Sequence, residues 1–361
     1  MSSFSFENRS FWDSLPRREK PVVLYGTGNG ADKILDLLEA RGIDADGVFA
    51  SDGFVRDRCF RGMKVMSYSD AVRCFGNDMT VLMAFGSNRP EVIQTAELLD
   101  EKHDLIIPEV PLYGGCLFDY SHFLDVYDRI ERLSDSLADE TSRAILYDLV
   151  NFRLTGKLKY LRRTQSLSDS MKELFHTDEI RSCFDGGAYK GDTLRGMMDS
   201  FPHLTQVYCV EPDPASFRQL KEFSESRKNI IINLHNVVLS DARGSVGFSS
   251  SAGRGAGVRS TSRRASSVTI AADTVDSILD GSSVDYIKLD VEGDEAYALR
   301  GASDTIRSFR PCLSVSVYHR TDDFLSIPDL IRTLYPGYRL YFRRQNCIPM
   351  WDLDLFAVPG T

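Results

Sequence analysis

The sequence has no long apolar run, no closely spaced pair of cysteines and no excess of basic residues. Its apolar segments all stay short of the roughly 18 residues that a membrane-spanning helix needs. Residues 1–20 are polar and mixed in charge, unlike a signal peptide. The seven cysteines are scattered without a C-x-x-C spacing, which argues against a disulfide framework or a zinc site and indicates reduced thiols. These features predict a cytoplasmic protein without stable membrane insertion.

The composition also limits the partners and the number of domains. A net charge of −9 disfavours broad binding to nucleic acid, because a phosphate backbone attracts a basic surface. With 42% hydrophobic and 26% charged residues, the chain has the composition of an ordinary globular protein. Its 361 residues exceed the usual size of one compact domain, so we expect two.

Strands alternate with helices in two separate blocks, which is typical of parallel α/β packing. In the first block a β-branched strand at 22–25 runs into the glycines of "YGTGNG", and another buried strand follows at 79–87. We assign residues 1–115 to an N-terminal Rossmann-like domain, residues 116–177 to a helical connector and residues 178–361 to a second, larger α/β domain. The N-terminal domain is a candidate surface for homo-oligomer formation.

The second block supplies the strands of a mostly parallel sheet. The strand candidates are 180–185, 206–211, 229–239, 284–290, 312–318, 338–343 and 354–359. Residues 245–270 are rich in Ser, Gly and Arg and lack a helical period, so they are predicted to form a hairpin or a mobile loop. The arginines of this stretch are candidate contacts to phosphate or to an acidic sugar in the acceptor, and a solvated loop is the alternative. These arginines are Arg254, Arg259, Arg263 and Arg264.

The stretch "SCFDGGAYKGDTL" raises the question of which ligand the second block binds. A dinucleotide site places a pyrophosphate against a glycine turn and a helix N-terminus. Here Asp185 precedes the glycines and Asp192 follows them. Like charges about 4 Å apart cost about 4 kcal/mol at an effective dielectric constant near 20, and a cationic ligand reverses that sign. S-adenosylmethionine carries a sulfonium and an ammonium group and no phosphate, so it suits this turn.

A second acid favours the same cofactor. Glu211 ends the strand candidate 206–211 and stands 26 residues after Asp185 (211 − 185). That spacing is close to the roughly 20-residue offset at which a carboxylate takes ribose hydroxyls. The alternative is that Glu211 only begins a turn, because "EPDP" is rich in turn residues. The two acids together, at the ends of successive strands, favour a methyl-donor site.

Four segments carry a resemblance to a known family. The segments "FDGGAYKGDT", "VEPDP", "VVLSD" and "IKLDVEGDEAYALRGA" resemble the successive motifs of FkbM-type methyltransferases, in the class I S-adenosylmethionine-dependent group. The resemblance covers residues 150–361 and implies a doubly wound, mostly parallel seven-stranded sheet whose last strand is antiparallel. It also implies O-methylation, for example of a sugar, a glycan or another small molecule.

The same resemblance implies roles for individual residues. Asp185, Gly186 and Gly187 would line the methionyl part of the donor. Glu211 would hold its ribose, and Asp241 or its neighbours would face the adenine. The full predicted set of donor-binding residues is Asp185, Gly186, Gly187, Ala188, Thr193, Glu211, Pro212, Asp213, Ser240 and Asp241.

The predicted catalytic residues are Asp290, Glu292 and His319. Chemistry in an open α/β sheet takes place at the carboxyl ends of the strands, and Asp290 and His319 each end a strand candidate. We predict that Asp290 orients the acceptor or balances the sulfonium and that His319 is the general base; a structural hydrogen bond is the alternative for His319. The neighbouring acids Asp294 and Glu295 suit Mg²⁺ or the first turn of a helix. Because the sequence shows no spaced ligand set, we predict no metal.

A rival interpretation uses the first block. "YGTGNG" has no acid before its glycines, and Asp52 stands 26 residues after Gly26 (52 − 26), where the ribose-binding acid of an NAD site would lie. The protein would then be an NAD-dependent nucleotide-sugar oxidoreductase or epimerase, although the sequence contains no Tyr-x-x-x-Lys pair. A third alternative is a binding protein without turnover. Under the methyltransferase interpretation, the N-terminal domain docks the acceptor or forms an oligomer.

Overall fold

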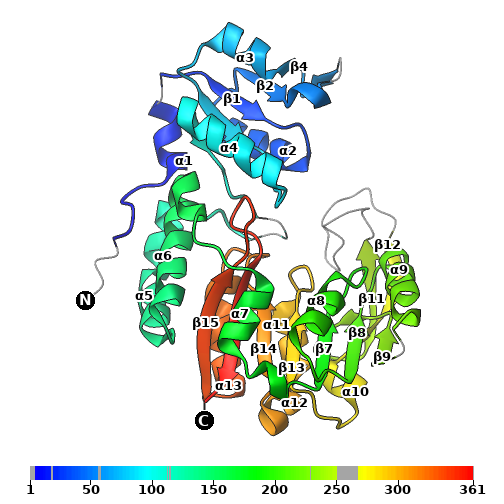
Figure 1. Ribbon diagram of the computed structural model, residues 1–361. Coiled ribbons are helices and arrows are strands. Elements are labelled where there is room, and N and C mark those ends of the chain that lie inside the picture. The colour runs from blue at the N-terminus through cyan, green and yellow to red at the C-terminus, as the bar shows by residue number, and fades with distance from the viewer. Residues whose placement is uncertain are drawn as a thin grey trace.

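The computed structural model describes residues 5–17, 19–55, 58–111, 113, 115–227, 229–249 and 267–360. It contains two α/β units, each built on its own sheet, with two long helices beside them (Figure 1). The N-terminal unit lies at the top of the view in blue and cyan, and the larger unit lies below it in green to red. The predicted α/β class is therefore confirmed.

The N-terminal sheet has six strands in the order β3-β4-β2-β1-β5-β6. Neighbouring strands are parallel except for β3 and β4. Its strands are β1 Val22–Tyr25, β2 Gly47–Ala50, β3 Cys59–Phe60, β4 Met63–Ser67, β5 Thr80–Met83 and β6 Asp104–Ile106. Its helices are α1 Phe11–Ser14, η1 Leu15–Arg17, α2 Asn29–Glu39, η2 Asp52–Phe54, α3 Tyr68–Phe75 and α4 Pro90–Lys102. All side chains of β1, β2 and β5 are buried, because helices cover a parallel sheet on both faces.

Two long helices follow the N-terminal unit. The helices of this part are α5 Tyr120–Ser136, α6 Glu140–Thr155, η3 Leu158–Leu161, α7 Leu167–Leu174 and η4 Thr177–Glu179. Asp119 and Asp139 begin the two long helices, where their carboxylates accept hydrogen bonds from backbone N–H groups. Gly156 ends α6 in the left-handed conformation, with a φ of +64°. Helix α6 then packs against β15 of the larger sheet.

The larger sheet has seven strands in the order β15-β16-β14-β13-β7-β8-β9. Its strands are β7 Ser182–Gly186, β8 Gln206–Val210, β9 Ile231–His235, β13 Tyr286–Leu289, β14 Cys312–Ser316, β15 Tyr338–Arg344 and β16 Leu353–Pro359. The last strand, β16, is antiparallel to both β14 and β15, and the other pairs are parallel. This is the predicted arrangement of a class I methyltransferase sheet.

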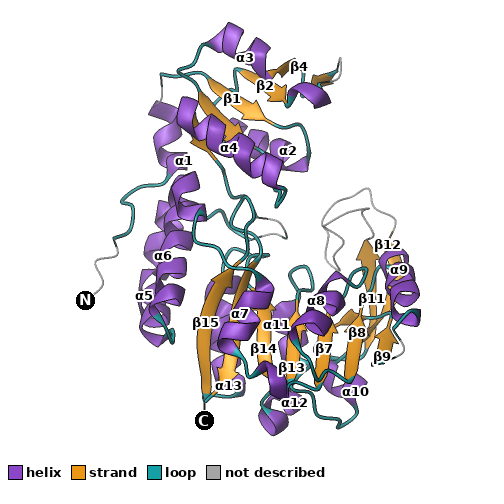
Figure 2. Ribbon diagram, in the orientation of Figure 1, coloured by secondary structure: helices purple, strands orange, loops and turns teal. Residues whose placement is uncertain are grey.

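Helices and a small second sheet complete the larger unit (Figure 2). The helices are α8 Asp192–Ser200, α9 Pro214–Glu225, α10 Val275–Leu279, α11 Glu295–Arg300, α12 Ser303–Phe309 and α13 Asp323–Leu334. The small sheet consists of β10 Val238–Leu239, β11 Gly244–Ser249 and β12 Ser267–Asp273. The single strand predicted at 229–239 is thus divided between β9 and β10. Residues 250–266, with the four predicted phosphate-binding arginines, lie outside the described residues.

The two units meet along several specific contacts. Ser87, after β5, pairs with Ile348 in an antiparallel bridge with N–H···O distances of 2.7 and 2.9 Å. Arg153 on α6 joins Glu109 at 3.1 Å and donates to the backbone oxygen of Thr321 at 2.5 Å. Because Arg153 is buried, these bonds tie the segment after β6 to the end of the larger sheet.

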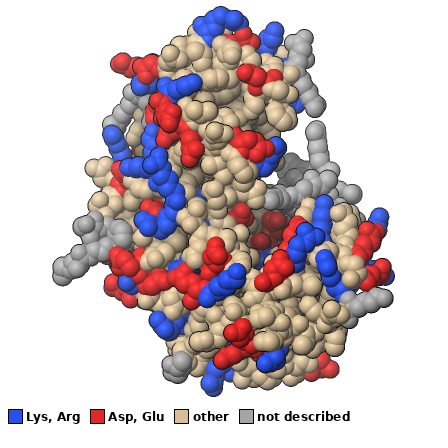
Figure 3. Space-filling view, in the orientation of Figure 1, with Lys and Arg blue, Asp and Glu red and all other residues tan. Residues whose placement is uncertain are grey.

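The surface carries both charge signs. On the face shown in Figure 3, acidic and basic side chains are interspersed over both units. Among the described residues, none of the helices combines the length and the apolar character that crossing a membrane requires.

Candidate active site

The first turn of the larger sheet lies against the end of β13. Strand β7 ends at Gly186, and Gly187 follows with a φ of +85°, a conformation that favours glycine. A Cβ atom on Gly187 would lie 1.9 Å from the backbone carbonyl oxygen of Asp290. Glycine is therefore required here by the close approach of two strand ends, and the turn is held beside Asp290.

Glu211 is fixed next to this turn. It follows β8, and its carboxylate oxygens accept hydrogen bonds from the backbone N–H of Tyr189 at 2.9 Å and of Asp213 at 2.8 Å. Burial raises the pKa of Glu211 to about 7, against the lowering effect of these two N–H groups. With only 7% of its surface exposed, this carboxylate stands at the end of β8 with its orientation set by the backbone.

Asp185 is paired with a residue that the sequence analysis missed. Lys288 on β13 is the register partner of Asp185 on β7. Its Nζ lies 3.7 Å from Asp185 Oδ1 and 3.6 Å from Asp290 Oδ2. Asp185 is completely buried, and burial raises its pKa to about 6 although Lys288 lowers it. The available signal was the alternation in "IKLD", which places Lys288 and Asp290 on one face of the strand.

A polar cavity of about 240 Å³ opens at the strand ends beside Asp290. It is lined by Leu167, Asp192, Thr193, Lys288, Asp290, Ser314, Ser316, Tyr318, Gln345, Asp352 and Asp354. Most of these side chains donate or accept hydrogen bonds. Burial and the charge of Asp290 raise the pKa of Asp354 to about 7, although Lys288 lowers it. The cavity is therefore suited to an acceptor rich in hydroxyl groups.

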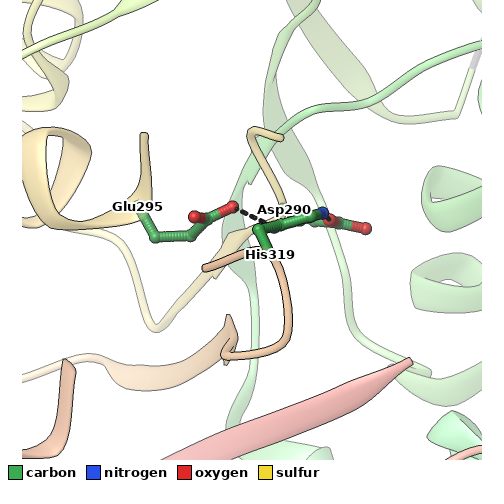
Figure 4. Close-up of side chains that lie close together, drawn as sticks. All are labelled: Asp290, Glu295 and His319. Carbon is green, nitrogen blue, oxygen red and sulfur yellow. Dashed lines mark hydrogen bonds and ion pairs between the residues drawn. The ribbon is translucent and has the colours of Figure 1, made fainter. Parts of the chain in front are cut away.

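His319 lies between Glu295 and Asp290 (Figure 4). Its Nδ1 is 2.8 Å from Glu295 Oε1, whereas its Nε2 is 3.6 Å from Asp290 Oδ1 and 3.5 Å from Glu292 Oε2. Burial would lower the pKa of His319, but these three carboxylates raise it to about 10. The histidine is 2% exposed, and it is absent from the lining of the polar cavity.

A tyrosine from the segment between the two units completes this cluster. The Tyr113 hydroxyl donates a hydrogen bond to Glu292 Oε2, and the Tyr113 ring lies edge-on to His319 at a centroid distance of 5.7 Å. Arg320 donates to the backbone oxygens of Gly293 at 2.6 Å and of Tyr113 at 3.2 Å. The sequence offered no signal for Tyr113, because its position depends on how the two units pack.

Comparison with known proteins identifies the larger unit. Residues 185–345 match the model of the methyltransferase FkbM domain. The chain contains a methyltransferase FkbM domain. This confirms the class that the motifs predicted, an S-adenosylmethionine-dependent methyltransferase. No curated protein matches the chain.

One solved structure shows the same fold. The methyltransferase FkbM from Methylobacillus flagellatus KT superposes with a TM-score of 0.71 at 19% identity, covering 96% of this chain and 92% of that one. The fold of the whole chain, including the N-terminal unit, therefore has a counterpart. Fibrillarin from Methanococcus jannaschii has a TM-score of 0.33 at 14% identity, covering 52% of this chain and 70% of that one. Precorrin-6y C5,15-methyltransferase from Geobacter metallireducens GS-15 has a TM-score of 0.34 at 9% identity, covering 54% and 87%.

Several predicted donor-binding residues of the FkbM domain hold its backbone in place. Ala188 is buried, and its N–H donates to the oxygen of Val210 at 3.0 Å. Asp213 begins α9, where its carboxylate accepts from the Ser216 N–H at 2.8 Å. The oxygen of Pro212 accepts from the Asn236 side chain at 3.1 Å.

The remaining predicted donor residues occupy two places. Ser240 and Asp241 follow β10, whose Leu239 side chain lies next to Gly186. Thr193 instead lines the polar cavity and accepts from Lys288 Nζ at 3.4 Å. The ends of β7 and β10 are thus neighbours, and Thr193 faces the polar cavity.

The rival glycine turn lies outside the residues that match the FkbM domain. Gly26 has a φ of +115°, and a Cβ atom on it would lie 2.7 Å from the Phe85 ring. Asp52 begins η2, and its carboxylate accepts from the Tyr68 N–H at 3.2 Å. The predicted ribose-binding acid of this turn therefore has a partner within the protein.

Proposed function

We propose that this protein transfers a methyl group from S-adenosylmethionine to a hydroxyl group of a sugar or glycan. The observation that carries the proposal is the polar cavity beside Asp290, next to the glycine turn of β7. A sugar offers many hydroxyl groups, and the aspartate, serine and glutamine side chains of this cavity can accept from and donate to them.

The donor site would lie around the first turn of the larger sheet. The residues present fit the donor, because Glu211 is a buried carboxylate at the end of the neighbouring strand and has the orientation to accept from ribose hydroxyls. S-adenosylmethionine supplies the methyl group when it is bound. Gly187 keeps the turn close to Asp290, so the donor and the acceptor would meet at the ends of β7 and β13.

Asp290 would orient the acceptor hydroxyl and take up its proton. It lines the cavity and has about a third of its side chain exposed, whereas His319 is enclosed and its Nδ1 is engaged by Glu295. His319 would therefore act as a positioning residue that faces Asp290 from behind. The proposal therefore gives Asp290 the role of general base, which the sequence analysis predicted for His319.

Positioning would contribute more to the rate than proton transfer. Alignment of reacting groups supplies roughly 7–11 kcal/mol of barrier reduction. A general base typically gives about 10²–10⁴-fold. A rigid cavity between fixed strand ends is the structure that such alignment requires.

A transfer assay tests the proposal. The full chain is incubated with methyl-labelled S-adenosylmethionine and a panel of glycans, free sugars and nucleotide sugars, and mass spectrometry locates the label in the product. We expect label on a sugar oxygen. Label on nitrogen or carbon would overturn the choice of acceptor, and binding of S-adenosylhomocysteine without any transfer would favour a binding protein without turnover.

A further inference from the structure

The turn after β13 has an uncommon backbone conformation that neighbouring groups hold. Glu292 and Gly293 both have a left-handed φ, +57° and +96°. Glycine adopts this conformation freely, whereas a glutamate adopts it rarely and keeps it where its surroundings fix it. The turn joins Asp290, directly after β13, to Glu295, the first residue of α11. The groups that hold the turn therefore also bear on the position of the Asp290 carboxylate.

Tyr113, from the segment between the two units, contacts this turn in three ways. Its hydroxyl donates a hydrogen bond to Glu292 Oε2. Its ring lies against Gly293, where a Cβ atom would stand 3.3 Å from Tyr113 Cγ. Its backbone oxygen accepts from Arg320 at 3.2 Å, and Arg320 also donates to the Gly293 oxygen at 2.6 Å. The hydroxyl, ring and backbone of one residue thus contact both left-handed positions.

Charged groups connect Glu292 to the polar cavity. Glu292 Oε2 lies 3.5 Å from His319 Nε2, and His319 Nε2 lies 3.6 Å from Asp290 Oδ1. On its other side, His319 Nδ1 lies 2.8 Å from Glu295 Oε1. The described lining of the cavity includes Asp290 but not Tyr113. Tyr113 is therefore placed to affect the reaction through its neighbours and not by touching the acceptor.

We propose that Tyr113 is a positioning residue that makes methyl transfer depend on the contact between the two units. Through Glu292 it holds the turn that presents Asp290 to the acceptor. The inference rests on the proposed function, in which Asp290 takes up the proton of the acceptor. It also goes further, because Tyr113 lies outside residues 185–345, which match the FkbM domain. The packing of the two units then becomes part of the catalytic geometry.

The Tyr113 hydroxyl also affects the charge of Glu292. Burial raises the pKa of Glu292, and so do the charges of Asp290 and Glu295. The charge of His319 and the hydrogen bond from Tyr113 lower this pKa. Loss of the hydroxyl should therefore raise the pKa of Glu292, which would then become protonated at a higher pH. The titratable groups that interact with Glu292 are those of Tyr113, Asp290, Glu295, Tyr318 and His319.

The kinetics of Tyr113→Phe in the full chain test the proposal. The acceptor is the panel compound that receives label from methyl-labelled S-adenosylmethionine. We expect kcat to fall by about 10–100-fold, because a displacement of reacting groups by about 1 Å can cost about 10²-fold. The KM for the acceptor and the affinity for S-adenosylhomocysteine should stay as in the wild type. The acidic limb of the pH–rate profile should move to higher pH, because Glu292 loses its charge earlier as the pH falls.

A double-mutant cycle separates this role from a loss of packing. If the hydroxyl acts through Glu292, Tyr113→Phe should lower kcat far less in a Glu292→Gln background than in the wild type. Tyr160→Phe is the matched control, because the Tyr160 hydroxyl also donates to a distant glutamate, Glu7, away from the described cavity lining. The control should keep the wild-type kcat and pH–rate profile. Additive effects in the cycle, or equal kcat values in Tyr113→Phe and Tyr160→Phe, would overturn the proposal.

Hydrogen exchange followed by mass spectrometry gives a readout that needs no acceptor. The backbone amides of residues 291–295 should exchange faster in Tyr113→Phe than in the wild type or in Tyr160→Phe. Unchanged exchange there would overturn the proposal even if no panel compound is methylated. Label on nitrogen or carbon, with slower transfer and faster exchange in Tyr113→Phe, would defeat the sugar hydroxyl as acceptor and leave the role of Tyr113 standing. Transfer to a sugar oxygen with the wild-type kcat in Tyr113→Phe would defeat the role of Tyr113 alone.

Discussion

The two sheets of this protein have similar glycine turns, after β1 and after β7, but different residues lie against these turns. In each, a strand (β1 or β7) runs into a glycine with a positive φ, +115° at Gly26 and +85° at Gly187. At Gly26 the neighbour within 3 Å of a Cβ position is the Phe85 ring, whereas at Gly187 it is the backbone of Asp290. An aromatic side chain thus lies against the turn in the N-terminal unit, whereas the backbone of Asp290, at the end of β13, lies against the turn in the larger unit.

The difference extends to the edge around each turn. Beside Gly187 the larger sheet holds several buried charged groups, including Asp185, Glu211 and Lys288. The corresponding edge of the N-terminal sheet leads into the contact with the larger unit, where a Cβ atom on Gly86 would lie 2.1 Å from the Trp351 ring. Buried charge is costly to maintain and marks functional sites. Buried charged residues therefore favour the edge of the larger sheet as the functional site. The fold that the two units share does not by itself indicate a function.

Removal of the Asp290 carboxylate should have the largest effect. Asp290→Asn keeps the shape and loses the charge, so we expect methyl transfer to fall by about 10²–10⁴-fold, the usual contribution of a general base. Donor affinity should change far less. Steady-state rates and calorimetry with S-adenosylhomocysteine measure the two effects.

Asp199→Asn is the control for Asp290→Asn, because Asp199 is an exposed acid on α8 away from the cavity lining. A rate for Asp290→Asn close to that of the control would remove Asp290 from the mechanism.

The link between the two units should be the next most sensitive point. Arg153 is 2% exposed and its partner Glu109 is 12% exposed. Arg153→Ala would leave a mostly buried carboxylate unpaired, and such a loss costs about 3–5 kcal/mol. Urea unfolding should show this lower free energy, and the double variant Arg153→Met, Glu109→Gln should recover part of it. An unchanged unfolding midpoint in Arg153→Ala would mean that the two units are stabilised independently of this pair.

The sequence predicted the sheet and the acids at its strand ends because both follow local rules. Buried strands leave apolar runs; Glu211 and Asp290 stand directly after β8 and β13, and Asp185 is the last residue but one of β7. The split of the 229–239 strand was not predictable in this way. The Asn236 side chain donates to the backbone oxygen of Glu211 at 2.7 Å, so a tertiary contact interrupts the strand.

Residues whose role depends on contacts between distant helices, strands or loops were the hardest to predict from the sequence. Lys288 could be read from strand alternation, but its pairing with Asp185 depends on the register between β13 and β7. Tyr113 reaches Glu292 across 179 residues, and no local pattern encodes such a contact. The base role predicted for His319 rested on its intrinsic pKa, whereas the folded chain surrounds this ring with three carboxylates.

Loss of the Glu211 charge should weaken donor binding moderately. Hydrogen bonds to a charged acceptor contribute about 1.5–3 kcal/mol, so Glu211→Gln should raise the dissociation constant of S-adenosylhomocysteine by about 10–100-fold. Calorimetric titration gives this value. Unchanged affinity would place the ribose elsewhere than at the end of β8.

The pH dependence of donor binding should follow the same residue. Glu211 in the free protein has a pKa raised to about 7 by burial, so it is increasingly protonated as the pH falls below 7. Ribose hydroxyls donate to the ionised form, so donor affinity should fall towards about tenfold per pH unit well below that pKa. The wild type should be titrated between about pH 5.5 and 8.5, a range of about three units around that pKa. Its donor affinity should show this dependence on pH. The slope should be absent in Glu211→Gln.

A substitution in the N-terminal unit should have the smallest effect on ligand binding and methyl transfer. It tests directly whether the two glycine turns differ in function. Asp52 already accepts from the Tyr68 N–H, and the Gly26 turn is covered by Phe85. Asp52→Asn should therefore leave S-adenosylhomocysteine binding and methyl transfer unchanged, and NAD should not bind either protein. Fluorescence titration with NAD and with S-adenosylhomocysteine distinguishes the two turns. If NAD binds the wild type and Asp52→Asn weakens it, the N-terminal turn holds a dinucleotide. Buried charge would then be only one of two ways in which this chain builds a ligand site, because backbone N–H groups at α2 would serve the phosphates without it.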